Sequence, residues 1–220
     1  MSKYSPDWIS NIESKQDTTR IKIIYPTIKY FFDDINEMRG ETRILDAGCG
    51  NGVFVDVLNL KDSDYLGIDL CPNNINHARQ KHSGKPNTRF EQGDITDVHS
   101  TDRSLILSVM TWHHIQDLRR LCHSSYSSLD SKESSDLLLL GVNSDSIDYW
   151  ISKYNKPTIC DNQIVGNMTL SNGTILSNHS MYFHNNNKVM HSLKDAGFSD
   201  IEINITNDQH ERFAIFTAKK

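Results

Sequence analysis

The sequence predicts an α/β fold built on a mainly parallel β-sheet with helices on both faces, and two features point to it. First, short apolar segments alternate with helical ones: the expected strands are residues 43–47, 65–70, 88–91, 104–110 and 136–142, and the expected helices are residues 53–58, 72–82 and 115–129. Strands that alternate with helices form βαβ units, whose crossovers cover both sheet faces. Second, residues 104–110 and 136–142 are almost continuously apolar, which is typical of strands buried on both faces.

The last third of the chain predicts the sheet's remaining strands. Residues 188–196 have a helical pattern that ends at Gly197, a residue type that readily adopts the left-handed conformation of a helix C-terminus. Two more strands follow at residues 201–205 and 213–218, joined by polar residues only. So short a connection requires an antiparallel pair.

Two segments lie outside this alternation. Residues 1–40 are expected to form a helical cap before the first strand, and residues 143–185 an insertion on the substrate side of the sheet. Within the insertion, Asn172-Gly173 flanked by β-formers predicts a hairpin over residues 168–176, since both turn positions favour positive φ. We expect one domain over residues 1–220.

Composition excludes several classes of protein. The 220 residues carry 23 Lys and Arg against 28 Asp and Glu, a net charge of −5, and this acidic balance argues against nucleic acid as a partner. No apolar run approaches the roughly 18 residues of a membrane span, and the first sixteen residues contain no apolar stretch suited to a secretory signal. The four cysteines are scattered and are expected to be reduced thiols. We therefore expect a cytoplasmic protein.

A glycine-rich loop follows the first expected strand. Residues 44–52 read Ile-Leu-Asp-Ala-Gly-Cys-Gly-Asn-Gly, with Gly48, Gly50 and Gly52 at alternate positions. Such glycines let the backbone approach a ligand closely, and the next helix offers unpaired N–H groups at its start. The spacing is tighter than the G-x-G-x-x-G of dinucleotide loops. A tight turn without a ligand is the alternative interpretation.

This loop resembles the nucleotide-binding signature of class I S-adenosylmethionine-dependent methyltransferases, and four further landmarks follow in the order of that family. They are Asp69 after the second strand, Gly93-Asp94-Ile95 after the third, residues 111–115 after the fourth, and residues 193–198, which are similar to a "Leu-x-x-Ala-Gly-Phe" segment. The resemblance implies a seven-stranded sheet in the order 3-2-1-4-5-7-6, with strand 7 antiparallel.

The resemblance also implies S-adenosylmethionine as the cofactor. Asp69 would accept hydrogen bonds from the ribose hydroxyls, although capping the helix at Pro72 is an alternative role; Asp94 would accept from the adenine amino group. The expected cofactor-binding residues are Asp46, Gly48, Cys49, Gly50, Gly52, Asp69, Leu70, Asp94, Ile95, Ser108 and Arg20.

For catalysis, His113 and His114 follow the fourth strand, where the substrate mouth of such a sheet lies. Either imidazole could take a proton from a nucleophile, and a purely structural role is the alternative. The expected substrate contacts are Tyr4, Trp8, His113, His179, Tyr182 and His184. No metal is expected, because the ten histidines lack ligand spacing such as H-E-x-x-H.

The sequence thus predicts methyl transfer from S-adenosylmethionine to an oxygen or nitrogen atom of a small molecule. Two alternatives stay open: a methyltransferase that acts on RNA or protein, and a methyltransferase-like subunit that binds the cofactor without turnover. The oligomeric state and the acceptor are not predicted.

Overall fold

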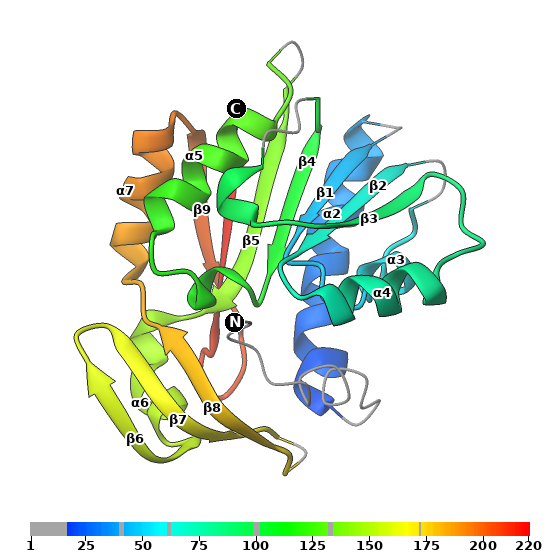
Figure 1. The fold of residues 1–220 in the computed structure, drawn as a ribbon. Coiled ribbons are helices and arrows are strands. Elements are labelled where there is room, and N and C mark those ends of the chain that lie inside the picture. Colours follow the sequence, from blue (N-terminus) through cyan, green and yellow to red (C-terminus); the bar gives the residue numbers. More distant parts are fainter. Residues whose placement is uncertain (1–16, 40–41, 61–62, 99–101, 132–133, 172) are drawn as a thin grey trace.

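The computed structural model describes residues 17–39, 42–60, 63–98, 102–131, 134–171 and 173–220. Within these residues a seven-stranded sheet has the order β3-β2-β1-β4-β5-β10-β9 (Figure 1). Its strands are β1 (Arg43–Ala47), β2 (Asp64–Asp69), β3 (Thr88–Gln92), β4 (Leu105–Val109), β5 (Asp136–Val142), β9 (Ser199–Ile205) and β10 (Phe213–Lys219).

The expected strand order is confirmed. Strands β6 to β8 belong to a separate sheet, so β9 and β10 are the sixth and seventh strands of the large one. β10 runs antiparallel to both β5 and β9, while β1 to β5 pair in parallel. The α/β fold class predicted from the alternation of elements is therefore correct.

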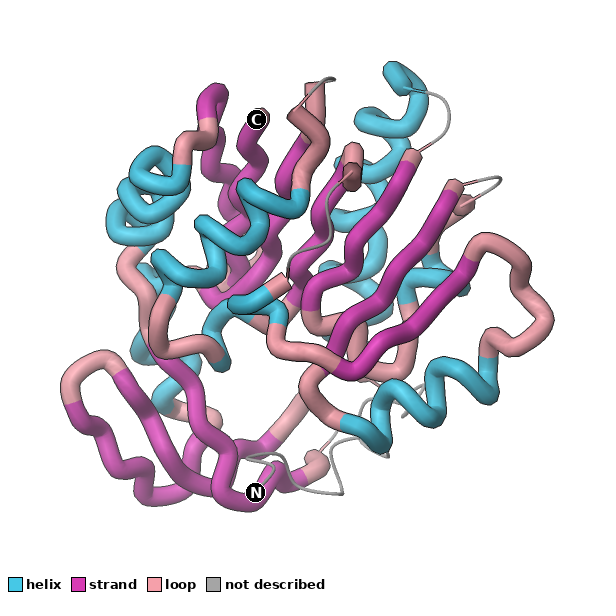
Figure 2. Tube along the Cα trace, turned by 45° about the horizontal axis from the view of Figure 1, so that its top comes forward, coloured by secondary structure: helices cyan, strands magenta, loops and turns pink. Residues whose placement is uncertain are grey.

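The helices cover both faces of this sheet (Figure 2). Helices α2 (Tyr25–Arg39), α3 (Phe54–Val57) and α4 (Pro72–Lys81) share one apolar cluster with one face, and the π-helical turn η1 (Arg20–Ile24) leads into α2. Helices α5 (Leu118–Ser128) and α7 (Asn186–Ala196), with the 3₁₀ turn η2 (Ile95–Asp97), pack in a second cluster on the other face. α7 ends at Gly197, which has a φ of 109° as expected for a left-handed cap.

The insertion folds into a small antiparallel sheet of its own. After the 3₁₀ turn η4 (Ser144–Ser146) and helix α6 (Ile147–Ile151), strands β6 (Tyr154–Cys160), β7 (Gln163–Thr169) and β8 (Ile175–Tyr182) pair in sequence order. The expected hairpin is confirmed, with Met168 opposite Leu176. This sheet lies beneath the carboxyl ends of β4 and β5 (Figure 1), and its buried side chains belong to the same apolar cluster as α2.

No helix among the described residues has both the length and the apolar character needed to cross a bilayer.

Candidate active site

The three glycines of the 48–52 loop all have positive φ, of 88°, 54° and 74°, but their surroundings differ. A Cβ on Gly48 would lie 2.3 Å from the Thr111 side chain, and one on Gly52 would lie 2.7 Å from the Phe90 ring. Both positions therefore need glycine for close packing within the protein. A Cβ on Gly50 would meet no atom within 4 Å. Gly50 alone of the three presents its backbone to open space that a ligand can enter.

Asp69, the last residue of β2, holds this loop against the start of α4. Its Oδ2 accepts from the Gly50 backbone N–H (2.9 Å), and its Oδ1 accepts from the Cys71 N–H (2.8 Å) and from Asn74 Nδ2 (3.3 Å). Burial raises the pKa of Asp69, and the hydrogen bonds from Cys71 and Gly50 oppose that rise. A carboxylate has about four acceptor positions, so one is left over after these three bonds. The structural role and the ligand-binding role are therefore compatible.

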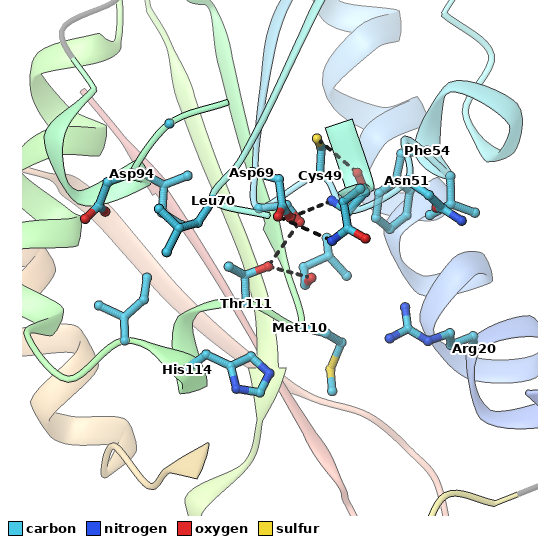
Figure 3. Close-up of a pocket in the computed structure, with 18 residues that line it drawn as sticks. Arg20, Cys49, Asn51, Phe54, Asp69, Leu70, Asp94, Met110, Thr111 and His114 are labelled. Atoms are coloured by element: carbon cyan, nitrogen blue, oxygen red, sulfur yellow. Dashed lines mark hydrogen bonds between the residues drawn. The ribbon is translucent and has the colours of Figure 1, made fainter. Parts of the chain in front are cut away.

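A hollow of about 860 Å³, including its open mouth, lies beside this loop at the carboxyl edge of the sheet (Figure 3). Its wall comes from the loops after β1, β2, β3 and β4 and from η1. The lining residues are Arg20, Gly48, Cys49, Gly50, Asn51, Val53, Phe54, Asp69, Leu70, Asn74, Gly93, Asp94, Ile95, Val109, Met110, Thr111, His114 and Ile115. We call it the cofactor hollow. It brings together most of the residues expected to bind the cofactor.

One end of the cofactor hollow is suited to a flat apolar ring. Leu70 is 51 % exposed although it is apolar, and Ile95 also lines the hollow. Asp94 is exposed, and its Oδ1 accepts from the N–H (2.9 Å) and the hydroxyl (2.8 Å) of Thr96 at the start of η2. Leu70, Asp94 and Ile95 thus offer apolar surface and a carboxylate in one wall.

Three of the expected cofactor-binding residues support the hollow from behind and do not line it. Asp46 is buried in β1 and accepts a hydrogen bond from the Tyr65 hydroxyl; burial raises the pKa of Asp46 to about 7. Ser108 in β4 is also buried and donates to the Ala47 carbonyl (3.0 Å). Gly52 packs on Phe90, as described above.

Arg20 of η1 lies on the side of the hollow opposite Leu70 and Asp94 (Figure 3). Its Nε lies 3.2 Å from an Asp17 carboxylate oxygen, and the side chain is 21 % exposed. A guanidinium here offers further N–H donors to a bound anion.

Met110 and Asn74 also line the cofactor hollow, and neither was expected from the sequence. Met110 follows β4, lines the hollow and has a φ of 56°, which is uncommon for a residue other than glycine. Nothing in the sequence marks such a backbone conformation at a methionine. Asn74 stands in the first turn of α4, within reach of Asp69. An asparagine five residues after the strand's terminal aspartate was the available signal.

His114 lines the cofactor hollow, whereas His113 does not. His114 lies in the 3₁₀ turn η3 (Trp112–His114), and its Nδ1 donates to the carbonyl of Ser180 in β8 (3.0 Å). In the neutral ring Nε2 therefore carries the lone pair. Burial lowers the pKa of His114 to about 4. His113 is 3 % exposed, its Nδ1 has no partner among the described residues, and burial next to His114 holds its pKa well below the usual value.

The histidines of the insertion have different surroundings. His179 of β8 is 2.6 Å from the Tyr154 hydroxyl through Nδ1, and burial lowers its pKa to about 3. His184 donates from Nε2 to the Ile115 carbonyl (2.7 Å) and stacks between Trp112 and Tyr182. His184 and Tyr182 line neither the cofactor hollow nor the neighbouring hollow formed with the small sheet.

The other two expected substrate contacts, Tyr4 and Trp8, lie outside the described residues.

A second hollow of about 820 Å³, including its open mouth, adjoins the first, with Arg20 and Met110 in both walls. Its wall combines η1 and the start of α2, the carboxyl edge of the large sheet, and the inner face of the small sheet. The lining residues are Asp17, Thr19, Arg20, Ile24, Met110, Val142, Tyr149, Trp150, Lys153, Met168, Thr169, Leu170, Ser171, Leu176, His179, Met181, Arg212 and Phe213. We call it the second hollow. Among the described residues, no cluster of histidine, cysteine or carboxylate side chains could hold a metal ion.

Part of the chain matches a known family model. Residues 44–132 match the family described as a methyltransferase domain, a segment that spans the glycine loop, Asp69, Asp94 and His114. None of the curated protein sequences matches the chain significantly.

Many solved structures share the fold at low sequence identity. The PH0226 protein of Pyrococcus horikoshii OT3 superposes with a TM-score of 0.72 at 14 % identity, over 94 % of this chain and 92 % of that one. An S-adenosylmethionine-dependent methyltransferase of Clostridium acetobutylicum ATCC 824 gives 0.71 at 15 % identity, over 96 % of each chain. Magnesium protoporphyrin IX methyltransferase (ChlM) of Synechocystis PCC 6803, whose structure contains bound S-adenosylhomocysteine (SAH), gives 0.65 at 15 % identity, over 90 % of this chain and 82 % of that one.

Proposed function

We propose that this chain is a class I S-adenosylmethionine-dependent methyltransferase that uses S-adenosylmethionine as its cofactor and methylates an oxygen or nitrogen atom of a small molecule. The observation that carries this proposal is the pair of adjoining hollows with Met110 and Arg20 in their common wall. The second hollow lies between the large sheet and the small sheet, beside that common wall.

The residues of the first hollow fit the cofactor. The open space at Gly50 accommodates a ligand against the backbone, and Asp69 retains acceptor capacity for a ribose hydroxyl. Leu70, Ile95 and Asp94 would hold the adenine ring and its amino group. Arg20 would receive the carboxylate of the methionine part, at the side where the second hollow begins.

The protein's contribution to the reaction is then orientation and exclusion of water. The bound cofactor supplies a methyl group on a sulfonium centre, so a nucleophile must approach that carbon in line. Met110 and His114, which follow β4, would hold the acceptor at this position. His114 has a lowered pKa and would meet the acceptor as a neutral ring near pH 7.

His113 has a supporting role in this proposal. It lies directly behind His114, with a distance of 4.2 Å between the ring centroids. We assign the direct contact to His114, because only His114 lines the cofactor hollow.

The test is methyl transfer from isotope-labelled S-adenosylmethionine to a metabolite extract. We expect label in products of low mass, and none with a Gly50→Val variant that cannot bind the cofactor. Label that appears only in the RNA or protein fraction would replace the small-molecule acceptor with a macromolecular one. Tight SAH binding without transfer to any fraction would indicate a cofactor-binding subunit.

A further inference from the structure

The second hollow is apolar over most of its wall. The large sheet contributes Val142 at the end of β5 and Phe213 at the start of β10, and the small sheet contributes Met168, Leu176 and Met181. All five of these side chains are buried. An occupant of this space is therefore expected to have a mainly apolar body, because burial of apolar surface is the favourable term available here.

Three cationic side chains interrupt the apolar wall, and two of them already have carboxylate partners. Arg20 pairs with Asp17. Arg212 donates from Nε to Asp208 (2.8 Å), and its Nη1 reaches the Tyr149 hydroxyl (3.2 Å). Asp17 is the one carboxylate among the lining residues given above. It also accepts from the backbone N–H groups of Thr19 and Arg20, so its acceptor positions are largely occupied.

Lys153 is the third cation, and it has no carboxylate partner among the described residues. Its ammonium lies 4.5 Å from the centre of the Tyr149 ring, and the side chain is half-buried. A partly desolvated ammonium beside apolar residues gains from an anionic partner more than an exposed one does. Lys153 lines the second hollow and is absent from the wall of the cofactor hollow.

We propose that the methyl acceptor is a mainly apolar small molecule bearing a carboxylate, which Lys153 binds at a point away from the atom that is methylated. This inference rests on the proposed function, since it takes the second hollow as the acceptor site. The methyl group is delivered at the wall shared by Met110 and Arg20, whereas Lys153 belongs to the second hollow alone. The product therefore keeps its negative charge.

The same wall disfavours a cationic acceptor. Arg20 is paired with Asp17 and Arg212 with Asp208, so Lys153 leaves one positive charge of this wall without a carboxylate partner among the described residues. An ammonium ligand would therefore meet like charge in a partly dry space. His179 does not change this charge, because burial lowers its pKa to about 3 and keeps the ring neutral near pH 7. Charge thus distinguishes acids from amines of the same shape.

A binding experiment tests the carboxylate site directly, with probes of equal shape. The protein is saturated with SAH, and 2-naphthoate, 2-naphthamide and 2-naphthylmethylammonium are titrated by calorimetry. We expect the acid to bind at least about tenfold more tightly than the amide, the lower end for a charged hydrogen bond, and the amine to bind most weakly. Equal affinities of acid and amide, no binding of the acid, or a preference for the amine would overturn the proposal.

Two substitutions locate the effect. Lys153→Met should remove most of the preference for the acid while leaving the affinities for the amide and for SAH unchanged, and Lys153→Arg should restore it. Lys194→Met makes the same charge change at an exposed position of α7 and should alter nothing. If the preference persists in Lys153→Met, Lys153 is not the anion site.

The labelled products distinguish a failure of this proposal from a failure of the proposed function on which it rests. Low-mass label that is retained on an anion exchanger at neutral pH supports an acidic acceptor. Low-mass label in the flow-through overturns the carboxylate while leaving small-molecule methylation intact. Label confined to RNA or protein refutes the proposed function itself, and with it the acidic small-molecule acceptor.

Discussion

Gly50 offers the sharpest test of where the cofactor binds. Alanine at this position adds one methyl group that would meet no protein atom within 4 Å, so steric conflict arises only with a bound ligand. The backbone carries a separate cost, because the φ of 54° is left-handed. That conformation costs a residue with a Cβ about 1–2 kcal/mol. For a protein of this size the melting temperature should fall by roughly 2–8 °C.

Gly173 provides a matched control for the backbone cost. It has a φ of 84° in the turn between β7 and β8, and a Cβ there would also meet no atom within 4 Å. Gly173→Ala therefore imposes similar strain and similar exposure of the new methyl group, but outside the cofactor hollow. Both variants should melt below the wild type by comparable amounts when no ligand is present.

The melting temperatures of the two variants should differ when SAH is added. At about 100 times its Kd a ligand stabilises by about 2.7 kcal/mol, or roughly 5–11 °C in the melting temperature. If Gly50→Ala weakens binding about a hundredfold, the same SAH concentration stabilises by only about 0.4 kcal/mol, near 1 °C. Differential scanning fluorimetry with and without SAH measures this. An SAH-induced shift in Gly50→Ala equal to that of Gly173→Ala and the wild type would show that the loop is only a turn.

Three further predictions concern buried or half-buried ionisable groups. Asp69→Asn places an amide donor against the backbone N–H groups that Asp69 accepts from, so SAH affinity should fall by at least about tenfold; unchanged affinity in calorimetry would contradict the assignment. Asp46 has a folded pKa of about 7, above its unfolded value of 3.8, so its contribution to stability is lost as the pH rises through 7. Relative to Asp46→Asn, which keeps an acceptor for Tyr65, the wild type should lose melting temperature between pH 5 and pH 8; parallel curves would refute this. His179→Leu leaves the Tyr154 hydroxyl unpaired and should cost about 1–3 kcal/mol at pH 7. Because the folded pKa of His179 is about 3, the wild type loses stability as the pH falls below 6.5, so urea unfolding should give a smaller difference at pH 5 than at pH 7.

The large sheet was predictable because its signals are local. The apolar runs of β4 and β5 are buried along their whole length, and the polar link before Phe213 requires an antiparallel last strand. The small sheet was predictable only at its hairpin. Six of the seven residues of β6 are not buried. The segment therefore has no alternation of apolar and polar residues that would identify it as a strand. The small sheet packs its buried apolar side chains into the same cluster as the large sheet, and this long-range contact cannot be read from the local sequence.

Site residues were predictable where a sequence motif implies a particular backbone geometry. Gly50 and Asp69 follow from the spacing of residues, and the structure brings both to one hollow. Met110 does not, since a positive φ at a methionine arises from the path of the chain after β4 and has no signature in residue type. Lys153 likewise becomes informative only when its lack of a carboxylate partner among the described residues is known.

One strand connects the two hollows, and its register matters for both. The carbonyl of Ser180 accepts from His114 in the wall of the cofactor hollow, while the side chain of the preceding residue, His179, lines the second hollow. Successive side chains of a strand point to opposite faces, so a slip of one residue in β8 would turn His179 away and shift the carbonyl that holds His114. The pairing of Gly166 with His179 and of Val165 with Ser180 fixes this register. Residues 179–180 therefore connect the wall of the second hollow to the turn that carries His114.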